Sequence, residues 1–267
     1  MATPNFRLSG SVGVSESAGT RVDMHVKVLD ERVATRAKAR GIDVLVYAPH
    51  FVRLPDVRET AARFSDDDLL VVPAREVFTG PFRDRRHVLA VGLSDPVPDF
   101  VTLEGAMAEF ERQDAAVLAP HPTFATVSLG LEEVLDYRDV VDAVETYNAK
   151  TFGRHDRRAR TLARRTGLPG FGSSYAHLRP TVGEAWTVFE TAIDSEGDLV
   201  DALQSATPRR VVRRAGVGHR VRGLAEFAHL GYENSWEKID RVFLSGDEPT
   251  HPDNVAYGGR FDDVKVY

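Results

Sequence analysis

The chain has 267 residues, of which 42% are hydrophobic and 28% are charged, and it contains no cysteine. This composition excludes a wholly disordered chain, a disulfide scaffold, a thiolate-held zinc or iron–sulfur site, and a cysteine nucleophile. The formal net charge of −6, from 40 acidic and 34 basic side chains, argues against a general nucleic-acid binder. Any metal site must therefore be built from histidine, carboxylate, amide or water ligands.

The first 20 residues are rich in Ser, Gly and Thr, and they contain no apolar stretch of the kind found in signal peptides. Residues 1–20 are therefore predicted to form a flexible tail. No segment approaches the roughly 18 consecutive apolar residues of a transmembrane helix, so no membrane association is expected. We accordingly predict a cytoplasmic protein.

Short apolar runs typical of strands alternate along the chain with stretches of helical periodicity. The strand-like runs are 44–47, 69–72, 88–91, 115–119 and 141–147. The helical stretches are 30–40, 102–112 and 157–166. This alternation predicts an α/β fold with a mainly parallel sheet.

Polar residues with ligand-type side chains follow most of the strands. They lie at intervals of 25 to 29 residues, except for one interval of 45 that contains a further strand near His87: His25, His50, Glu76, His121, Asn148 and His177. A (β/α) barrel of about 250 residues in eight units repeats about every 31 residues. We therefore expect these side chains at the carboxyl-terminal rim of a barrel, where barrel enzymes have their active sites.

Each of these residues also has a purely structural interpretation, since a single histidine after a strand is most often a loop residue. Five of the nine histidines nevertheless share this placement, at positions 25, 50, 87, 121 and 177. Such a cluster with a carboxylate suits Zn, Mn or Fe. Glu76 is the candidate bridge between two metals, unless Arg75 or Arg86 pairs with it as a structural salt bridge.

Seven short segments carry these residues in a distinctive order. They are 23–27 (DMHVK), 41–50 (GIDVLVYAPH), 72–76 (VPARE), 87–90 (HVLA), 119–122 (APHP), 145–148 (ETYN) and 174–177 (SYAH). Together they resemble the PHP (polymerase and histidinol phosphatase) family over about residues 21–190. The resemblance implies a distorted (β/α)7 TIM-like barrel of the PHP type, up to three metals at its rim, and phosphoester hydrolysis.

The resemblance implies three metal sites, and the chain matches the first of them only in part. That site uses two histidines of the opening motif, the Glu, and an Asp of the closing motif. His25 and Glu76 are present, but Lys27 stands in place of the second histidine and Tyr175 in place of the Asp. We expect this site to be empty or weak.

The other two sites are better preserved. The second is complete: its ligands are Glu76, His87 and His121. The third matches in His50 and His177, with Asp30 as a candidate partner at a shorter spacing than usual. The resemblance therefore implies two divalent ions rather than three.

Lys27 and Tyr175 each allow two interpretations. The Lys27 ammonium can occupy the place of a cation and offer its charge to a phosphate, without lowering the pKa of a bound water, or it can mark a degenerate site. Tyr175 can donate a hydrogen bond to a substrate oxygen or fill the space of the missing ligand. Lys27, Glu76 and His177 are the candidate catalytic residues.

The last third of the chain is less informative. We expect the barrel over 21–208, a basic and helical extension over 209–245 that packs on the barrel or on a second subunit, and a polar tail over 246–267. A homo-oligomer is compatible with this division. The paired arginines between 209 and 222 indicate either an anion or RNA contact or a solvated basic turn, and the lack of an aromatic residue to stack on a base favours the turn.

Two functions of different classes follow. The first is a divergent metal-dependent phosphoesterase that hydrolyses a phosphate mono- or diester in a small phosphorylated substrate or a short oligonucleotide, with Arg154 or Arg179 receiving the phosphate. The second is a catalytically degenerate barrel that binds RNA or protein, similar to the subunit of this fold in ribonuclease P. The five histidines and Glu76 favour the enzyme, and hydrolysis of an amide or another ester on the same metals is a third, weaker candidate.

Overall fold

The computed structural model describes residues 19–81, 84–123, 127–150, 153–232 and 249–267. The predicted flexible tail over 1–20 therefore lies almost entirely outside the described residues, and the first strand begins at Thr20. None of the helices formed by the described residues is both long and apolar enough to cross a membrane.

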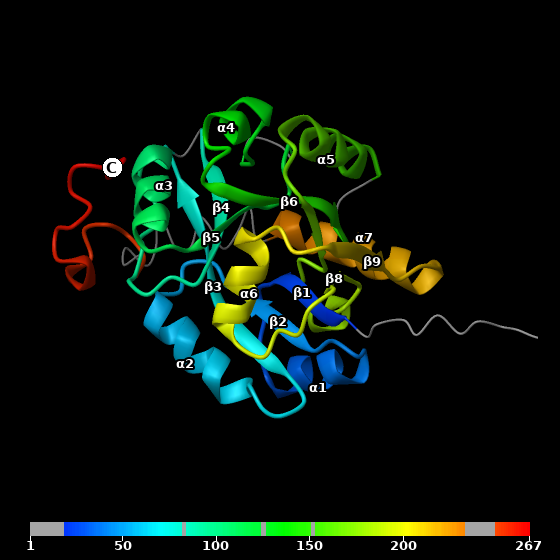
Figure 1. Ribbon diagram of the computed structural model, residues 1–267. Helices are drawn as coiled ribbons and strands as arrows, with labels where there is room; N and C mark the ends of the chain where they lie inside the picture. The colour runs from blue at the N-terminus through cyan, green and yellow to red at the C-terminus, as the bar shows by residue number, and fades with distance from the viewer. Residues whose placement is uncertain (1–18, 82–83, 124–126, 151–152, 233–248) are drawn as a thin grey trace, which may run out of the picture.

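Nine strands form one sheet in the order β7-β6-β5-β4-β3-β2-β1-β8-β9. Their bounds are β1 (Thr20–Val26), β2 (Val44–Tyr47), β3 (Leu70–Thr79), β4 (Arg86–Val91), β5 (Ala116–Ala119), β6 (Val141–Asn148), β7 (Gly170–Ser173), β8 (Ala185–Phe189) and β9 (Arg209–Arg213). Just past β7, Ala176 forms a parallel bridge with Val26 of β1, and its carbonyl accepts a hydrogen bond from the Lys27 amide at 2.8 Å. The sheet thereby curls into a nearly closed barrel of the PHP type, as the sequence predicts (Figure 1).

Strand β4 departs from the parallel arrangement that the alternation of elements predicts. It pairs antiparallel with β3 and with β5. The physical reason is the short connection over 80–85, which is long enough for a hairpin but too short for the crossover that a parallel pair needs. Because β4 runs in the opposite direction, its first residues, including His87, lie at the same rim as the carboxyl ends of the parallel strands.

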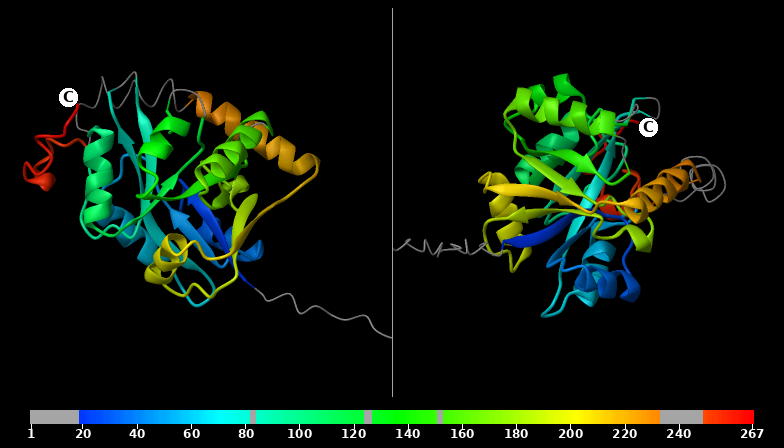
Figure 2. Two further views of the ribbon diagram at one scale, coloured as in Figure 1. Left: turned by 45° about the horizontal axis from the view of Figure 1, so that its top comes forward. Right: turned by 90° about the vertical axis from the view of Figure 1, so that its right-hand side faces the viewer.

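In the part of the chain that the structure describes, seven helices and two short 3-10 turns surround the barrel. They are α1 (Glu31–Ala39), α2 (Leu54–Phe64), α3 (Leu103–Arg112), α4 (Leu131–Asp136), α5 (Gly153–Thr166), α6 (Glu196–Gln204), α7 (Val217–Tyr232), η1 (Arg179–Thr181) and η4 (Val255–Tyr257). Helices α1 and α2 lie on one side of the barrel and α4 and α5 on the opposite side (Figure 1), which the right-hand view of Figure 2 also shows.

Side chains alternate between two apolar layers along the strands. In β4, Leu89 and Val91 point into the interior cluster, while Val88 and Ala90 join the cluster beneath α3. Leu199 and Leu203 of α6 pack into the interior cluster, so α6 covers the end of the barrel opposite the ligand rim. Both faces of the sheet are therefore buried, and the rim remains the accessible end.

The C-terminal part of the chain corrects two sequence-based expectations. Residues 209–213, assigned to an extension, form β9 and pair antiparallel with β8, so the sheet continues beyond 208. The predicted polar tail is not a projecting tail in residues 249–267: its Tyr257 and Phe261 are buried in the cluster beneath α3, and the Thr102 amide donates to the Val264 carbonyl at 2.8 Å. The prediction failed because two aromatic residues in a polar segment are enough to anchor it beside α3 (Figure 1).

Candidate metal centre

Glu76, in the long strand β3, is the centre of the rim. Its side chain has no solvent exposure, and the polar groups that face it come from the ends of several strands. The alternative that Glu76 serves a salt bridge with a neighbouring arginine is wrong, because Arg75 pairs with Asp99 at 2.9 Å and Arg86 pairs with Glu133 at 2.9 Å. Both of its oxygens therefore face the cluster of histidines and Lys27.

The Oε2 atom of Glu76 faces a protein cation. Lys27 Nζ lies 2.5 Å from it and also donates to the Ala48 carbonyl at 2.5 Å. His50 Nε2 lies at 2.8 Å and His25 Nε2 at 3.6 Å from the same oxygen. The ammonium group thus takes the place that the PHP resemblance assigns to a metal on this side.

Among the described residues, the Oε1 atom of Glu76 faces two imidazoles. His121 Nε2 lies 2.9 Å from it and His87 Nδ1 lies 3.4 Å from it. One ligand atom from each of the three residues lies within 4.8 Å of the others, which is the separation expected of donors around a single ion. The three residues come from β3, the start of β4 and the turn after β5, so the antiparallel course of β4 is what completes the group.

His87 gives the clearest indication that this half fits a metal. Its ring is buried and stacked on Phe78 with the centroids 3.9 Å apart, and within the described residues neither ring nitrogen has a hydrogen-bond partner. Leaving a buried polar group unsatisfied costs about 1–3 kcal/mol, so a native structure rarely does so without a reason. A divalent ion held by His87, His121 and Glu76 would supply that reason.

The electrostatics of the centre keep the imidazoles neutral. Burial, together with the positive charge of Lys27, lowers the pKa of His25 to about 3, and burial lowers the pKa of His87 to about 4. Burial and lysine charges also hold the pKa values of His50 and His177 well below the usual range. Burial raises the pKa of Glu76, but the charge of Lys27 and contacts with His25 and His121 outweigh it, so the pKa is well below its usual value. A neutral imidazole and an ionised carboxylate are the forms that bind a metal.

Further polar groups fix the orientation of His121. Its Nδ1 lies 2.9 Å from Ser128 Oγ, and its amide donates to Glu145 Oε2 at 2.6 Å. Glu145 also accepts from Asn148 Nδ2 at 3.0 Å, while the Asn148 side-chain oxygen accepts from the Lys150 amide at 2.9 Å. Asn148 is thus a support for this turn and not a ligand, which corrects its place in the sequence pattern.

Tyr175 fills the space of the ligand that the family resemblance assigns to its position. Its backbone is in the left-handed region with φ of 46°, which a bulky residue adopts only when its surroundings hold it there. The ring centroid lies 4.5 Å from that of His25, 5.1 Å from that of His121 and 4.9 Å from that of His177. Of the two interpretations, the ring contacts favour the filling of space.

The remaining pair, His50 and His177, lies on the outer side of the centre. Their ring centroids are 5.3 Å apart, and the His50 side chain is 24% exposed, the most exposed of the five histidines of the cluster. Asp30 does not join them. It caps α1 by accepting from the Val33 amide and pairs with Arg179, so it is a structural residue, and the predicted role of Arg179 in binding phosphate is weakened with it.

Two residues of the centre, Lys150 and Glu226, are not among those predicted from the sequence. Lys150, buried just beyond the end of β6, lies 4.1 Å from the ring centroid of Tyr175 and 3.4 Å from Glu226 Oε2. Glu226 belongs to α7 but is fully buried, and its Oε1 accepts from the amides of His177 at 3.0 Å and Leu178 at 2.7 Å. Position after a strand signals Lys150, whereas nothing in the sequence around Glu226 indicates that α7 reaches the rim.

Comparison with known proteins adds family evidence to this geometry. A family model described as PHP-associated matches residues 153–208, which run from α5 to the start of β9. The ordered ligand motifs occupy the chain before and within that match. In this match and in the order of its ligand motifs the chain resembles the PHP family, and its barrel is of the PHP type. No curated protein matches its sequence.

Solved structures of similar fold are distant from this chain in sequence. PsfC from Pseudomonas syringae PB-5123 is 20% identical with a TM-score of 0.61, over 79% of this chain and 98% of that one. Endonuclease Q in complex with a 27-mer duplex with an abasic lesion is 14% identical with a TM-score of 0.51, and the endonuclease of Pyrococcus furiosus is 13% identical with a TM-score of 0.50. The matches span 72% of this chain but only 58% and 57% of the two endonuclease chains. These likenesses concern the fold.

Proposed function

We propose that this protein is a metal-dependent phosphoesterase of the PHP type in which one metal of the family has been replaced by the ammonium group of Lys27. The observation that carries the proposal is that the two carboxylate oxygens of Glu76 face different groups. One oxygen is 2.5 Å from Lys27 Nζ, and the other faces His121 and His87, whose imidazoles are of the type that holds a divalent ion. The chain therefore offers one built-in cation and one site for Zn, Mn or Fe on opposite sides of a single carboxylate.

The protein groups have separate tasks in this proposal. Glu76, His87 and His121 would hold the ion, and His50 and His177 would hold a second one. A bound divalent ion supplies a Lewis acid and a water of lowered pKa, which is the nucleophile that phosphoester hydrolysis needs at neutral pH. Lys27 adds positive charge for the phosphate, but it does not acidify water. Tyr175 and Phe78 pack against the histidine rings and exclude bulk water from this side of the centre.

Support for this reaction class also comes from the fold. The endonuclease Q structure, which shares the fold, holds a DNA duplex with the lesion at its active site. A barrel of this kind thus accommodates phosphodiester substrates in at least one relative. A small phosphorylated substrate and a short oligonucleotide are both within the proposal, and a cytoplasmic location remains a prediction.

The second candidate is a catalytically degenerate barrel that binds RNA or protein. It is favoured by the same lysine, because an ammonium bound to Glu76 and to the Ala48 carbonyl completes one half of the centre without any metal. Tyr175, wedged among three histidines, adds to this interpretation. It leaves the buried nitrogens of His87 unexplained.

Metal analysis combined with a phosphoester assay separates the two candidates. We expect purified protein to retain a divalent ion through gel filtration and to hydrolyse a chromogenic phosphoester with added Mn or Zn. The His87→Ala/His121→Ala variant should lose both the ion and turnover. The matched control is His251→Ala, which removes a histidine outside the centre and should change neither. A metal-free wild type without turnover that copurifies with RNA would overturn the proposal and support the degenerate barrel.

A further inference from the structure

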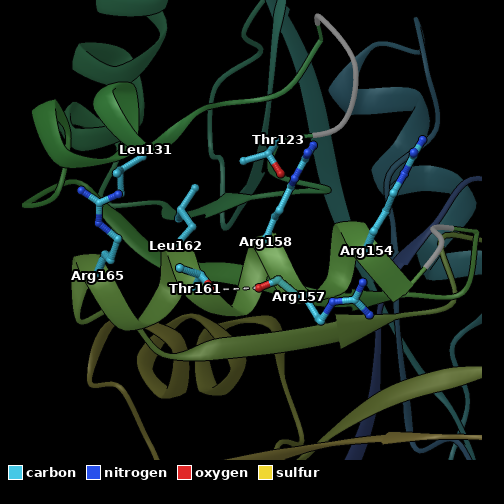
Figure 3. Close-up of a pocket in the computed structure, with 8 residues that line it drawn as sticks. All are labelled: Thr123, Leu131, Arg154, Arg157, Arg158, Thr161, Leu162 and Arg165. Atoms are coloured by element: carbon cyan, nitrogen blue, oxygen red, sulfur yellow. Dashed lines mark hydrogen bonds between the residues drawn. The ribbon is translucent and has the colours of Figure 1, made fainter.

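A groove lined by arginines lies beside the rim, on the outer face of α5. It is a cavity of about 480 Å³ whose lining includes four arginines of this helix and no acidic residue: Arg154, Arg157, Arg158 and Arg165. Its floor is apolar, formed by Leu131 at the start of α4 and Leu162 of α5 (Figure 3). A cavity of this size is within the range of ligand-binding pockets.

The spacing of the arginines places them along one stripe of the helix. Arg154, Arg158, Thr161 and Arg165 follow each other at intervals of four, three and four residues, which is the repeat of a single helical face. In Figure 3, Arg154 and Arg158 extend from α5 in the same direction. Because an α-helix rises about 1.5 Å per residue, the stripe from Arg154 to Arg165 is about 16 Å long.

The charge of this helix contrasts with that of the whole chain. The protein has a net charge of −6, yet α5 carries six arginines, and its one acidic residue, Asp156, is buried. Within the part of the chain that the structure describes, no carboxylate forms an ion pair with any of the four arginines in the groove. Four guanidinium groups without acidic partners create a strong local positive potential.

One residue of the groove lies close in the chain to the metal centre. Thr123, which lines it, follows His121 by two residues, and its hydroxyl oxygen is buried without a hydrogen-bond partner among the described residues. Arg154 stands at the start of α5, the end that follows the rim of β6, and Arg165 stands at the far end. The stripe therefore leads from the rim along the outside of the barrel.

From these observations we propose that the α5 groove binds the phosphodiester backbone of an oligonucleotide strand that reaches the metal centre. One phosphate occupies only a small part of a stripe about 16 Å long, whereas phosphates of one strand follow each other at about 3.4 Å along the axis. The lining contains no aromatic residue on which a base could stack, so the contacts are to phosphates and independent of base sequence. This inference rests on the proposed function for its substrate class, since it selects a nucleic-acid diester over a small phosphorylated molecule.

Fluorescence anisotropy with a labelled single-stranded oligothymidylate tests the groove directly. The measurement is made in excess chelator at several salt concentrations, so that it does not depend on the metal centre. Arg154→Gln/Arg158→Gln should weaken binding about tenfold and reduce the slope of log affinity against log salt by about 1.4, that is about 0.7 for each lost contact. The matched control is Arg160→Gln/Arg164→Gln, which removes two exposed arginines of the same helix that do not line the groove and should change affinity less than twofold.

Further arms separate the outcomes. Arg154→Lys/Arg158→Lys should keep most of the affinity, and circular dichroism should show all variants folded. Free phosphate should not displace the oligonucleotide. A wild type that binds inorganic polyphosphate but not the oligonucleotide would overturn the proposal. Equal losses in the two Gln variants would also overturn it, because they would show a general charge effect. Hydrolysis of a small chromogenic phosphoester should be unchanged in Arg158→Gln/Arg165→Gln, which removes two other arginines of the groove, so a failure of the metal centre is distinguished from a failure of the groove.

Discussion

The two halves of the Glu76 site differ in where their positive charge comes from. On the Oε2 side the chain supplies it covalently, through Lys27 at 2.5 Å. On the Oε1 side the facing groups are imidazole nitrogens, His121 Nε2 at 2.9 Å and His87 Nδ1 at 3.4 Å, which are metal-ligand types and not fixed charges. The two oxygens of one carboxylate thus have different partners, and under the proposed function a lysine on one side does not remove the metal site on the other.

Removing the shared carboxylate should have the largest effect, because both halves depend on it. Glu76→Gln leaves the buried ammonium of Lys27 without its counter-charge, and breaking a buried ion pair in this way costs about 3–5 kcal/mol. The same change removes a metal ligand, so bound metal and phosphoester turnover should both disappear. Urea denaturation and metal analysis check the two effects. A variant as stable as the wild type would mean that Lys27 is not held by Glu76.

Substituting Lys27 alone should lower turnover and leave metal binding on the Oε1 side unchanged. Lys27→Met keeps the volume of the side chain but removes its charge, so we expect turnover to fall about a hundredfold, as on loss of one preorganised electrostatic contact. Metal content should stay unchanged, because the ligands on the Oε1 side are intact. Lys38→Met, which removes a surface lysine paired with Asp66, is the control. Retained turnover would show that the Lys27 half has only a structural role.

The metal half can be weakened without touching a ligand. Ser128 Oγ lies 2.9 Å from His121 Nδ1, and it holds the ring so that Nε2 faces Glu76. Ser128→Ala should reduce metal affinity about 10- to 100-fold, the usual cost of losing the partner that orients a ligand. Competition with a chromogenic chelator measures this. Ser128→Ala leaves the ion pair of Lys27 with Glu76 in place, so the stability of the metal-free protein should change by much less than in Glu76→Gln.

The acid sensitivity of the metal-free protein should reveal the neutral histidines. Burial lowers the pKa of His87 from 6.5 in the unfolded chain to about 4 in the folded protein. Between these two pH values the unfolded chain therefore carries a proton on His87 that the folded protein does not. Stability therefore falls as the pH falls through this window. His87→Gln should make the plot of unfolding free energy against pH shallower by about 1.4 kcal/mol per pH unit between about pH 4.5 and 6. His251→Gln should leave the slope as in the wild type.

The sequence indicated the barrel and most of the centre, because ligand-type residues after strands repeat with the period of the fold. It also located the break in the centre, since Lys27 and Tyr175 stand in positions that the resemblance assigns to ligands. Spacing along the chain could not show strand direction. The rim position of His87 depends on the antiparallel course of β4, which a short hairpin connection imposes.

Other parts of the site depend on contacts between distant segments, which no local pattern encodes. Asp30 and Asn148 have ligand-type side chains, but each is used by neighbouring backbone amides, those of Val33 and Lys150 respectively. Glu226 reaches His177 from a helix 49 residues further along the chain. The anchoring of the C-terminal segment by Tyr257 and Phe261 is likewise a result of packing.

The central claim is that a divalent ion binds on the Oε1 side of Glu76 while Lys27 occupies the Oε2 side. A crystal structure of the protein soaked in Mn or Zn, with anomalous scattering to locate the ion, tests it most directly. We predict an anomalous peak ligated by Glu76, His87 and His121, with Lys27 Nζ still in contact with Glu76. Absence of any peak among these three residues, or an ion that displaces Lys27, would contradict the account.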